Sequence, residues 1–200
     1  MKKIKNLLSI FVILASLTFV SCENEPLDQT LLNNTNTGGG IIDGGVPNNG
    51  NFKVKIDGEW FTPANIAGLK VMPNSVNLQP FPSYTILGAS DSGKFVSIQF
   101  YYTTTFNLIT GFSTTSNNIA TIAYSPNGNL PDDQIQLYVS VNAADPFSTT
   151  GSVNLNNNAT QQLLNGTFQT TVYLLDDNGN VIGSKSLTEG TLTNFPYTIE

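Results

Sequence analysis

The fold is decided by the stretch Phe52-Lys53-Val54-Lys55-Ile56-Asp57-Gly58-Glu59-Trp60-Phe61. Apolar residues alternate with lysines over 52–56, and this period of two predicts a half-buried strand. The Asp-Gly pair at 57–58 predicts a two-residue hairpin turn, because such a turn needs φ > 0 at its central residues. Residues 59–62 then form the returning strand. Trp60, the only tryptophan, could stack on a ligand, but in a first hairpin we expect it to belong to the core.

The same alternation recurs further along the chain, in the segments 96–102, 134–141 and 168–174. Two other segments, 84–89 and 119–124, are apolar on both faces, as central strands are. Turns rich in Asp, Asn and Gly separate these strands, and only 104–108 and 159–164 are candidates for a short helix. The pattern predicts an all-β domain, built as an antiparallel β-sandwich or a flattened up-and-down β-barrel.

Upstream of this domain, residues 1–21 have the organisation of a lipoprotein signal peptide. Three lysines precede an uncharged run over 7–20, which is shorter than the ~20 residues of a membrane span. Phe19-Val20-Ser21 resembles a lipobox, with phenylalanine in place of the usual leucine. We therefore expect Cys22, the only cysteine, to carry a lipid that anchors the protein to a membrane.

Residues 22–51 are rich in Gly, Asn and Thr and predict a flexible tether, which leaves 52–200 as the folded domain. Glu23 and Glu25 resemble the surface-export signal of lipoproteins from Bacteroidota, although acidic residues also simply solvate a tether. The expected location is the outer membrane, with the cell surface favoured over the periplasmic side.

The composition limits the catalytic and binding chemistry that the chain can support. The chain has 8 Lys and Arg against 14 Asp and Glu, a net charge of −6, and no histidine. Such a charge disfavours nucleic acid as a partner. The lack of histidine excludes Ser-His-Asp and Cys-His nucleophile pairs and His-ligated zinc. We expect no cofactor and no enzymatic activity.

Four stretches carry a family resemblance. They are the 52–61 hairpin, Gly151-Ser152-Val153, Gly166-Thr167-Phe168 and Thr188-Glu189-Gly190. Their order is similar to that of small lipoproteins of unknown function from Bacteroidota, which usually have phenylalanine where Leu192 stands here. The resemblance implies the all-β fold and the cell envelope, and it brings no catalytic residue.

Three tyrosines are the main candidates for ligand binding. Tyr101, Tyr138 and Tyr173 fall on the predicted outward faces of their strands, beside glutamines and threonines. Aromatic rings flanked by amides and hydroxyls suit a sugar. Cross-strand pairing that only stabilises the sheet, or burial on a second face, would explain the same residues.

Carboxylates give two weaker candidates. Asp176, Asn178 and Asn180 offer oxygen ligands for calcium, but a tight turn explains them equally and the spacing is not that of an EF-hand. Asp132 and Asp133 are adjacent carboxylates for a remote glycoside-hydrolase alternative. The leading hypothesis is a lipid-anchored binding module whose ligand is a glycan or an envelope protein; the alternative is a structural envelope component.

Overall fold

The computed structural model describes residues 45–73, 81–102, 105–111, 118–131, 134–141, 145 and 148–200. Cys22, Glu23, Glu25, Asp132 and Asp133 lie outside the described residues, so the predictions made for them stay predictions. The described part is all-β, as predicted, and contains no helix long and apolar enough to cross a membrane. Its strands are β1 (Val46–Pro47), β2 (Phe52–Ile56), β3 (Glu59–Phe61), β4 (Asn65–Val71), β5 (Ser83–Ala89), β6 (Phe95–Tyr101), β7 (Asn107–Gly111), β8 (Ile119–Ser125), β9 (Tyr138–Val139), β10 (Thr149–Asn158), β11 (Leu163–Leu175), β12 (Val181–Pro196) and β13 (Thr198–Ile199).

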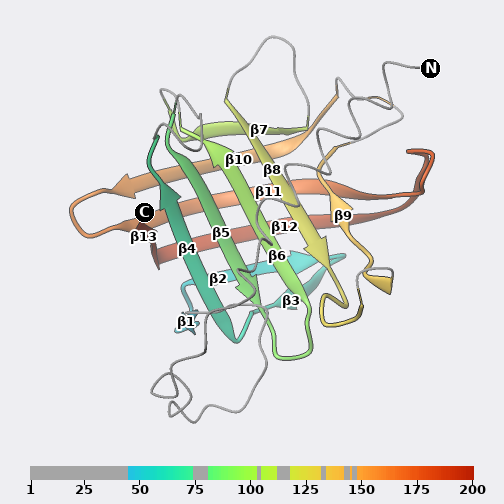
Figure 1. The fold of residues 1–200 in the computed structure, drawn as a ribbon, viewed down its shortest axis with the longest axis horizontal. Helices are drawn as coiled ribbons and strands as arrows, with labels where there is room; N and C mark the ends of the chain where they lie inside the picture. Colours follow the sequence, from blue (N-terminus) through green and yellow to red (C-terminus); the bar gives the residue numbers. More distant parts are fainter. Residues whose placement is uncertain are drawn as a thin grey trace, which may run out of the picture. The chain divides into compact units, whose positions relative to one another are not determined.

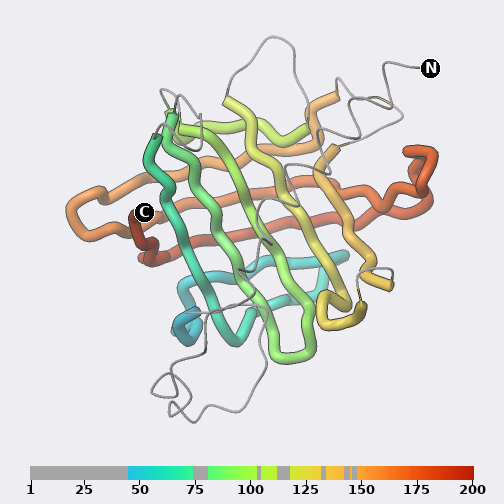
Figure 2. The backbone as a smooth tube through the Cα atoms, viewed as in Figure 1, coloured from blue at the N-terminus to red at the C-terminus, as the bar shows by residue number. Residues whose placement is uncertain are grey.

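The strands form two layers that cross each other (Figure 1). One layer contains β4, β5, β6 and β8, and the other contains β10, β11, β12, β2 and β3, in these orders. Figure 2 shows the green and yellow strands of the first layer running across the orange and red strands of the second. Alternate side chains of both layers are buried and form one apolar core, to which Ile98 and Phe168 contribute from opposite layers.

The layers are joined by a small closed barrel. β8 pairs with β7, β7 with β10, β10 with β11, β11 with β9, and β9 with β8. The β7–β8 pair is parallel and the other four pairs are antiparallel. The structure is therefore mostly antiparallel, as predicted, but it is a five-strand mixed barrel with further strands packed outside it, in place of an up-and-down barrel.

Threonine hydroxyls connect three neighbouring strands of this barrel. The Oγ1 atoms of Thr110, Thr150 and Thr170 lie 2.8–3.1 Å from one another, and Thr150 Oγ1 also donates to the carbonyl oxygen of Ser140. Thr110 and Thr170 are buried. Among the described residues no buried side-chain nitrogen or oxygen lacks a partner, so this polar part of the core is fully hydrogen-bonded.

The β2–β3 hairpin forms as its sequence predicts. Asp57 and Gly58 have φ values of 50° and 87°, which is the left-handed geometry of the two-residue turn. Phe52 and Val54 are buried. The prediction for Trp60 was wrong, because 51% of its surface is exposed. Trp60 pairs with Lys55 across the hairpin and therefore shares the outward face of the lysines.

The two helix candidates are not helical where the structure describes them. Residues 107–108 belong to strand β7. Residues 159–162 form the turn between β10 and β11, and 163–164 begin β11. Both segments are short and flanked by strands, so neither could bury enough surface to stabilise a helix of its own.

The chain is already attached to the domain before residue 52. β1 pairs with β4, and Asn48 ties β2 to the segment after β3. Asn48 Nδ2 donates to the carbonyl oxygens of Phe52 and Pro63, both at 2.9 Å, and Asn48 Oδ1 accepts from the backbone N–H of Phe52. The strand β1 and the contacts of Asn48 therefore lie inside the segment predicted as tether.

Candidate functional site

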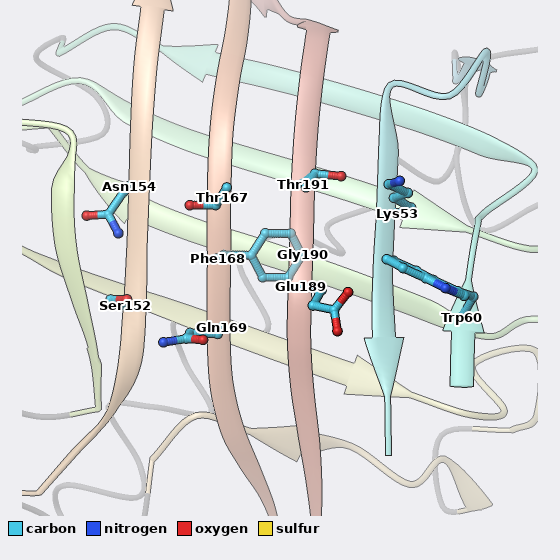
Figure 3. Close-up of a pocket in the computed structure, with 10 residues that line it drawn as sticks. All are labelled: Lys53, Trp60, Ser152, Asn154, Thr167, Phe168, Gln169, Glu189, Gly190 and Thr191. Atoms are coloured by element: carbon cyan, nitrogen blue, oxygen red, sulfur yellow. The ribbon is translucent and has the colours of Figure 1, made fainter. Parts of the chain in front are cut away.

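The outer face of the β10–β11–β12–β2–β3 layer carries a shallow, open hollow of about 440 Å³. Figure 3 shows its side chains on the neighbouring strands β10, β11, β12, β2 and β3, with the strands of the other layer crossing behind them. The lining residues are Lys53, Trp60, Ser152, Asn154, Thr167, Phe168, Gln169, Glu189, Gly190 and Thr191. They come from the 52–61 hairpin and from the segments 152–154, 167–169 and 189–191, which the fold places on adjacent strands.

Polar side chains cross this face in a row, one from each of β10, β11, β12 and β2. The strand register pairs Asn154 with Thr167, Thr167 with Thr191, and Thr191 with Lys53. All four are at least partly exposed, because they alternate along their strands with buried core residues. The result is a line of one amide, two hydroxyls and one ammonium group.

A bulge in β12 shapes the part of the hollow around Glu189. The register of β12 shifts against both of its neighbours, between Phe168 and Thr170 on one side and between Thr188 and Thr191 on the other. Glu189 sits in the bulge with φ 51°. Such a bulge redirects a side chain, and here the Glu189 carboxylate reaches Lys55 Nζ at 2.7 Å.

Gly190 follows in the bulge and faces the core. A Cβ atom at this position would lie 2.6 Å from two ring atoms of Phe168, which is buried beneath the hollow. Only glycine therefore lets the Phe168 ring pack directly against β12. The floor of the hollow depends on this contact.

Trp60 borders the hollow at the edge strand β3 (Figure 3). Lys53 Nζ lies 4.9 Å and Lys55 Nζ 5.0 Å from the centroid of the indole ring. These are cation–π distances. Lys55 is neutralised by Glu189, whereas Lys53 makes no ion pair with a carboxylate of the described residues.

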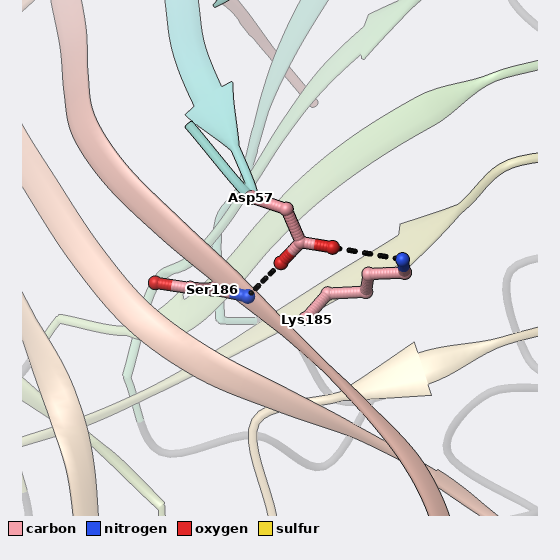
Figure 4. Close-up of polar contacts among 3 residues, drawn as sticks. All are labelled: Asp57, Lys185 and Ser186. Carbon is pink, nitrogen blue, oxygen red and sulfur yellow. Dashed lines mark hydrogen bonds and ion pairs between the residues drawn. The ribbon is translucent and has the colours of Figure 1, made fainter. Parts of the chain in front are cut away.

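Asp57 holds the hairpin that carries Trp60 against β12 (Figure 4). Its carboxylate accepts from Lys185 Nζ at 2.8 Å and from the backbone N–H of Ser186 at 2.9 Å. The hydrogen bond from Lys185 is the main cause that lowers the pKa of Asp57, and the bond from Ser186 adds to it. The same contact raises the pKa of Lys185.

The three tyrosines predicted from the sequence do not form one site. Tyr101 lies on β6, in the other layer. Tyr138 and Tyr173 lie on the paired strands β9 and β11, but Tyr138 is opposite Leu174 and Tyr173 is opposite Val139, so they face opposite sides.

The outward orientation predicted for Tyr138 was wrong. Tyr138 is 8% exposed and its ring packs 5.7 Å from that of Tyr124, while Leu137, predicted to be buried, is exposed. The reason is that only residues 138 and 139 of this segment are paired, so the alternation does not continue from a full strand.

The calcium candidate is a closed turn. Asp176 Oδ1 accepts from the backbone N–H groups of Asn178 and Asn180, and Asp176 Oδ2 accepts from Asn180 Nδ2. These bonds lower the pKa of Asp176, with those from Asn180 contributing most. The described residues contain no group of three or more potential metal-binding side chains of the Asp, Glu, Cys or His type. A turn that satisfies its own carboxylate accounts for this sequence.

The sequence did contain the signal for Trp60. Once the Asp-Gly turn fixes the hairpin register, Trp60 must lie opposite Lys55 and face outward. On β10, β11 and β12 the outward positions could also be identified in the sequence, because they are polar residues that lie between buried ones. That these strands are neighbours was not readable.

Comparison of the chain with protein-family models, curated proteins and solved structures found no match.

Proposed function

We propose that the domain is a non-catalytic carbohydrate-binding module whose ligand stacks on Trp60 and extends across β12 and β11. The observation that carries this proposal is the half-exposed Trp60 at one end of a row of amide and hydroxyl side chains. Tryptophan combines a large apolar ring with a polar N–H group and is enriched at recognition surfaces.

The chemistry of the hollow suits a sugar. Pyranose rings present C–H groups that pack on an aromatic face, and hydroxyls that exchange hydrogen bonds with amides and hydroxyls. Trp60 supplies the face, and Thr191, Thr167 and Gln169 lie beyond it on the neighbouring strands. A site of this type combines one apolar contact with a few polar groups that fix the ligand's orientation.

The open shape of the hollow sets the expected strength of binding. A ligand on an open sheet face keeps much of its surface in water, so the stacking contact and a few hydrogen bonds must provide the affinity. We expect dissociation constants of about 0.1–1 mM for a short oligosaccharide. Several modules on one surface would raise the apparent affinity for a polymeric glycan.

The small number of carboxylates in the hollow favours binding without catalysis. A glycoside hydrolase needs two carboxyl groups on either side of the scissile bond. Glu189 is the single carboxylate among the lining residues, and it is paired with Lys55. The remote alternative based on Asp132 and Asp133 falls outside the described residues.

The binding module is proposed to act at the cell envelope. In this proposal Cys22 carries the lipid, the segment that follows is the tether, and Glu23 and Glu25 direct the protein to the cell surface. The envelope-protein ligand and the structural role are the alternatives. A structural role through the edge of β4 receives less support, because β1 and β13 both cover that edge.

The test is ligand-observed NMR with a panel of neutral and acidic oligosaccharides. Trp60→Ala should weaken binding of any positive sugar by about tenfold, because the stacking face is lost. Trp60→Phe keeps an aromatic ring and should retain part of the affinity. Tyr101→Ala lies in the other layer and is the matched control. Equal binding by Trp60→Ala and the unmodified protein would reject the proposal.

A further inference from the structure

We infer that the sugar bound at Trp60 is acidic, with a carboxylate that contacts Lys53. This inference rests on the proposed function and specifies the ligand class. Its starting point is the charge at the ring: two ammonium groups lie about 5 Å from the indole centroid, and only one of them has a carboxylate partner among the described residues.

Lys53 is the cation of the hollow that has no ion-pair partner in the part of the chain that the structure describes. Lys55 and Glu189 form an ion pair at 2.7 Å, and Asp57 is engaged by Lys185 and Ser186. Among the described residues, no carboxylate forms an ion pair with Lys53. The side chain is exposed and stands at the end of the polar row, next to Thr191. An anionic group on the ligand could therefore form an ion pair with the Lys53 ammonium group.

Stacking itself favours an acidic sugar over a neutral one. A ring that packs on Trp60 competes with the ammonium groups for the indole face. A neutral sugar would displace the Lys53 ammonium group from the ring without providing an anion to pair with it. A uronate displaces the same ammonium group and then binds it through its carboxylate, with a charge-assisted hydrogen bond. The cation–π contact is thus exchanged for an ion pair only when the sugar carries an anion.

The net charge of the chain does not oppose this contact at physiological salt. The chain is acidic overall, at −6. At an ionic strength of about 0.15 M the Debye length is ~8 Å, so acidic groups elsewhere on the domain are largely screened. The contact between Lys53 and a bound carboxylate is short and keeps most of its strength.

The experiment compares oligogalacturonate with its fully methyl-esterified form, which has the same chain but no charge. Trp60 is the only tryptophan, so its fluorescence reports binding at this site directly. The acid should bind about fivefold more tightly than the ester, as expected for one exposed charge pair. Lys53→Gln should reduce the affinity for the acid to that for the ester, and should leave the affinity for the ester unchanged or slightly higher. Lys70→Gln, on β4, is the matched control, because it removes the same charge outside the hollow.

The outcomes separate the inference from the proposed function. Equal affinity for acid and ester, or an equal loss of both in Lys53→Gln, would overturn the inference and leave a neutral-sugar module standing. If neither probe nor any neutral oligosaccharide changes the emission of Trp60, both the inference and the proposed function fail. A preference for the acid that persists in Lys53→Gln would also overturn the inference, since the charge would be recognised elsewhere.

Discussion

Asp57 has two structural roles at the turn between β2 and β3. Its backbone occupies the left-handed region, with φ 50°, and its carboxylate binds Lys185 and the backbone N–H of Ser186. Asparagine also tolerates this backbone conformation and would keep the oxygen that accepts from Ser186. The substitution Asp57→Asn therefore isolates the charge of the contact with Lys185.

The stability effect of Asp57→Asn should depend on pH. The pKa of Asp57 is lowered in the folded state, so its charged form stabilises the fold above the unfolded pKa of about 3.9, and this contribution is lost as the pH falls through the folded pKa. At pH 7 the variant should unfold more easily by about 1 kcal/mol or less, because both partners are partly exposed. As the pH falls toward about 2, the difference should shrink, since the Asp57 carboxylate of the unmodified protein becomes protonated in both its folded and its unfolded state.

Urea unfolding at the two pH values measures this difference. Asp177→Asn is the control, because it removes a carboxylate of an exposed turn for which the structure shows no ion pair. A deficit of Asp57→Asn that is the same at both pH values would contradict the prediction and would point to the turn geometry as the cause.

At the residue scale, the sequence correctly predicted which side chains are buried wherever a full strand sets the alternation. Phe52, Val54, Ile98 and Phe168 are buried as the period of two requires. The prediction for Tyr138 failed because its segment is paired over two residues only. The prediction for Trp60 failed because the hairpin register, which places it opposite Lys55, outweighs the general preference of tryptophan for burial.

At the element scale, β12 illustrates how a bulge shapes a site. The pairing of this long strand is interrupted at Thr188 and Glu189 against β11, and at Glu189 and Gly190 against β2. The bulge turns the Glu189 carboxylate toward Lys55 and places Gly190 over the ring of Phe168. The Glu-Gly pair in the sequence thus corresponds to a local change of register, which no period-two pattern predicts.

Gly190→Ala should destabilise the domain. The added Cβ would lie 2.6 Å from the Phe168 ring, which is itself buried and in contact with Phe52. Overpacking of this kind costs about 1–3 kcal/mol. Gly183→Ala on the same strand is the matched control, since its Cβ would meet side chains only at 3.7–3.8 Å. Urea unfolding of both variants gives the comparison, and equal stability would show that Phe168 can move aside.

At the scale of the whole molecule, the main features depend on contacts between distant segments. β2 pairs with β12, and β7 pairs in parallel with β8 to close the barrel. Local alternation predicts that strands exist and which face is apolar, but it holds no information on which strands are neighbours. The candidate site is therefore absent from a sequence-level prediction as a site, although the alternation predicted the strands β2 and β3 and part of β11.

The two ends of the described chain cover the same sheet edge. β1 pairs with β4 at residues 65–66, and β13 pairs with it at residues 69–70. The backbone of Glu200 adds hydrogen bonds to Lys70 and Met72. An uncovered edge strand offers free N–H and C=O groups to other chains, so these two short strands protect the domain from edge-to-edge association.

Deletion of residues 198–200 should therefore promote self-association while the fold is retained. Tyr197, which is buried and packs against Tyr84, stays in place, so the core is intact. The freed part of β4, with Leu69 and Val71, would then pair with a second copy. Analytical ultracentrifugation should show a concentration-dependent dimer for the truncated protein. Replacement of residues 198–200 by three alanines is the control, because backbone pairing can persist and association should be weaker. A truncated protein that stays monomeric at the highest concentration would show that β13 does not protect this edge, and that the order of the β4 edge depends on other contacts.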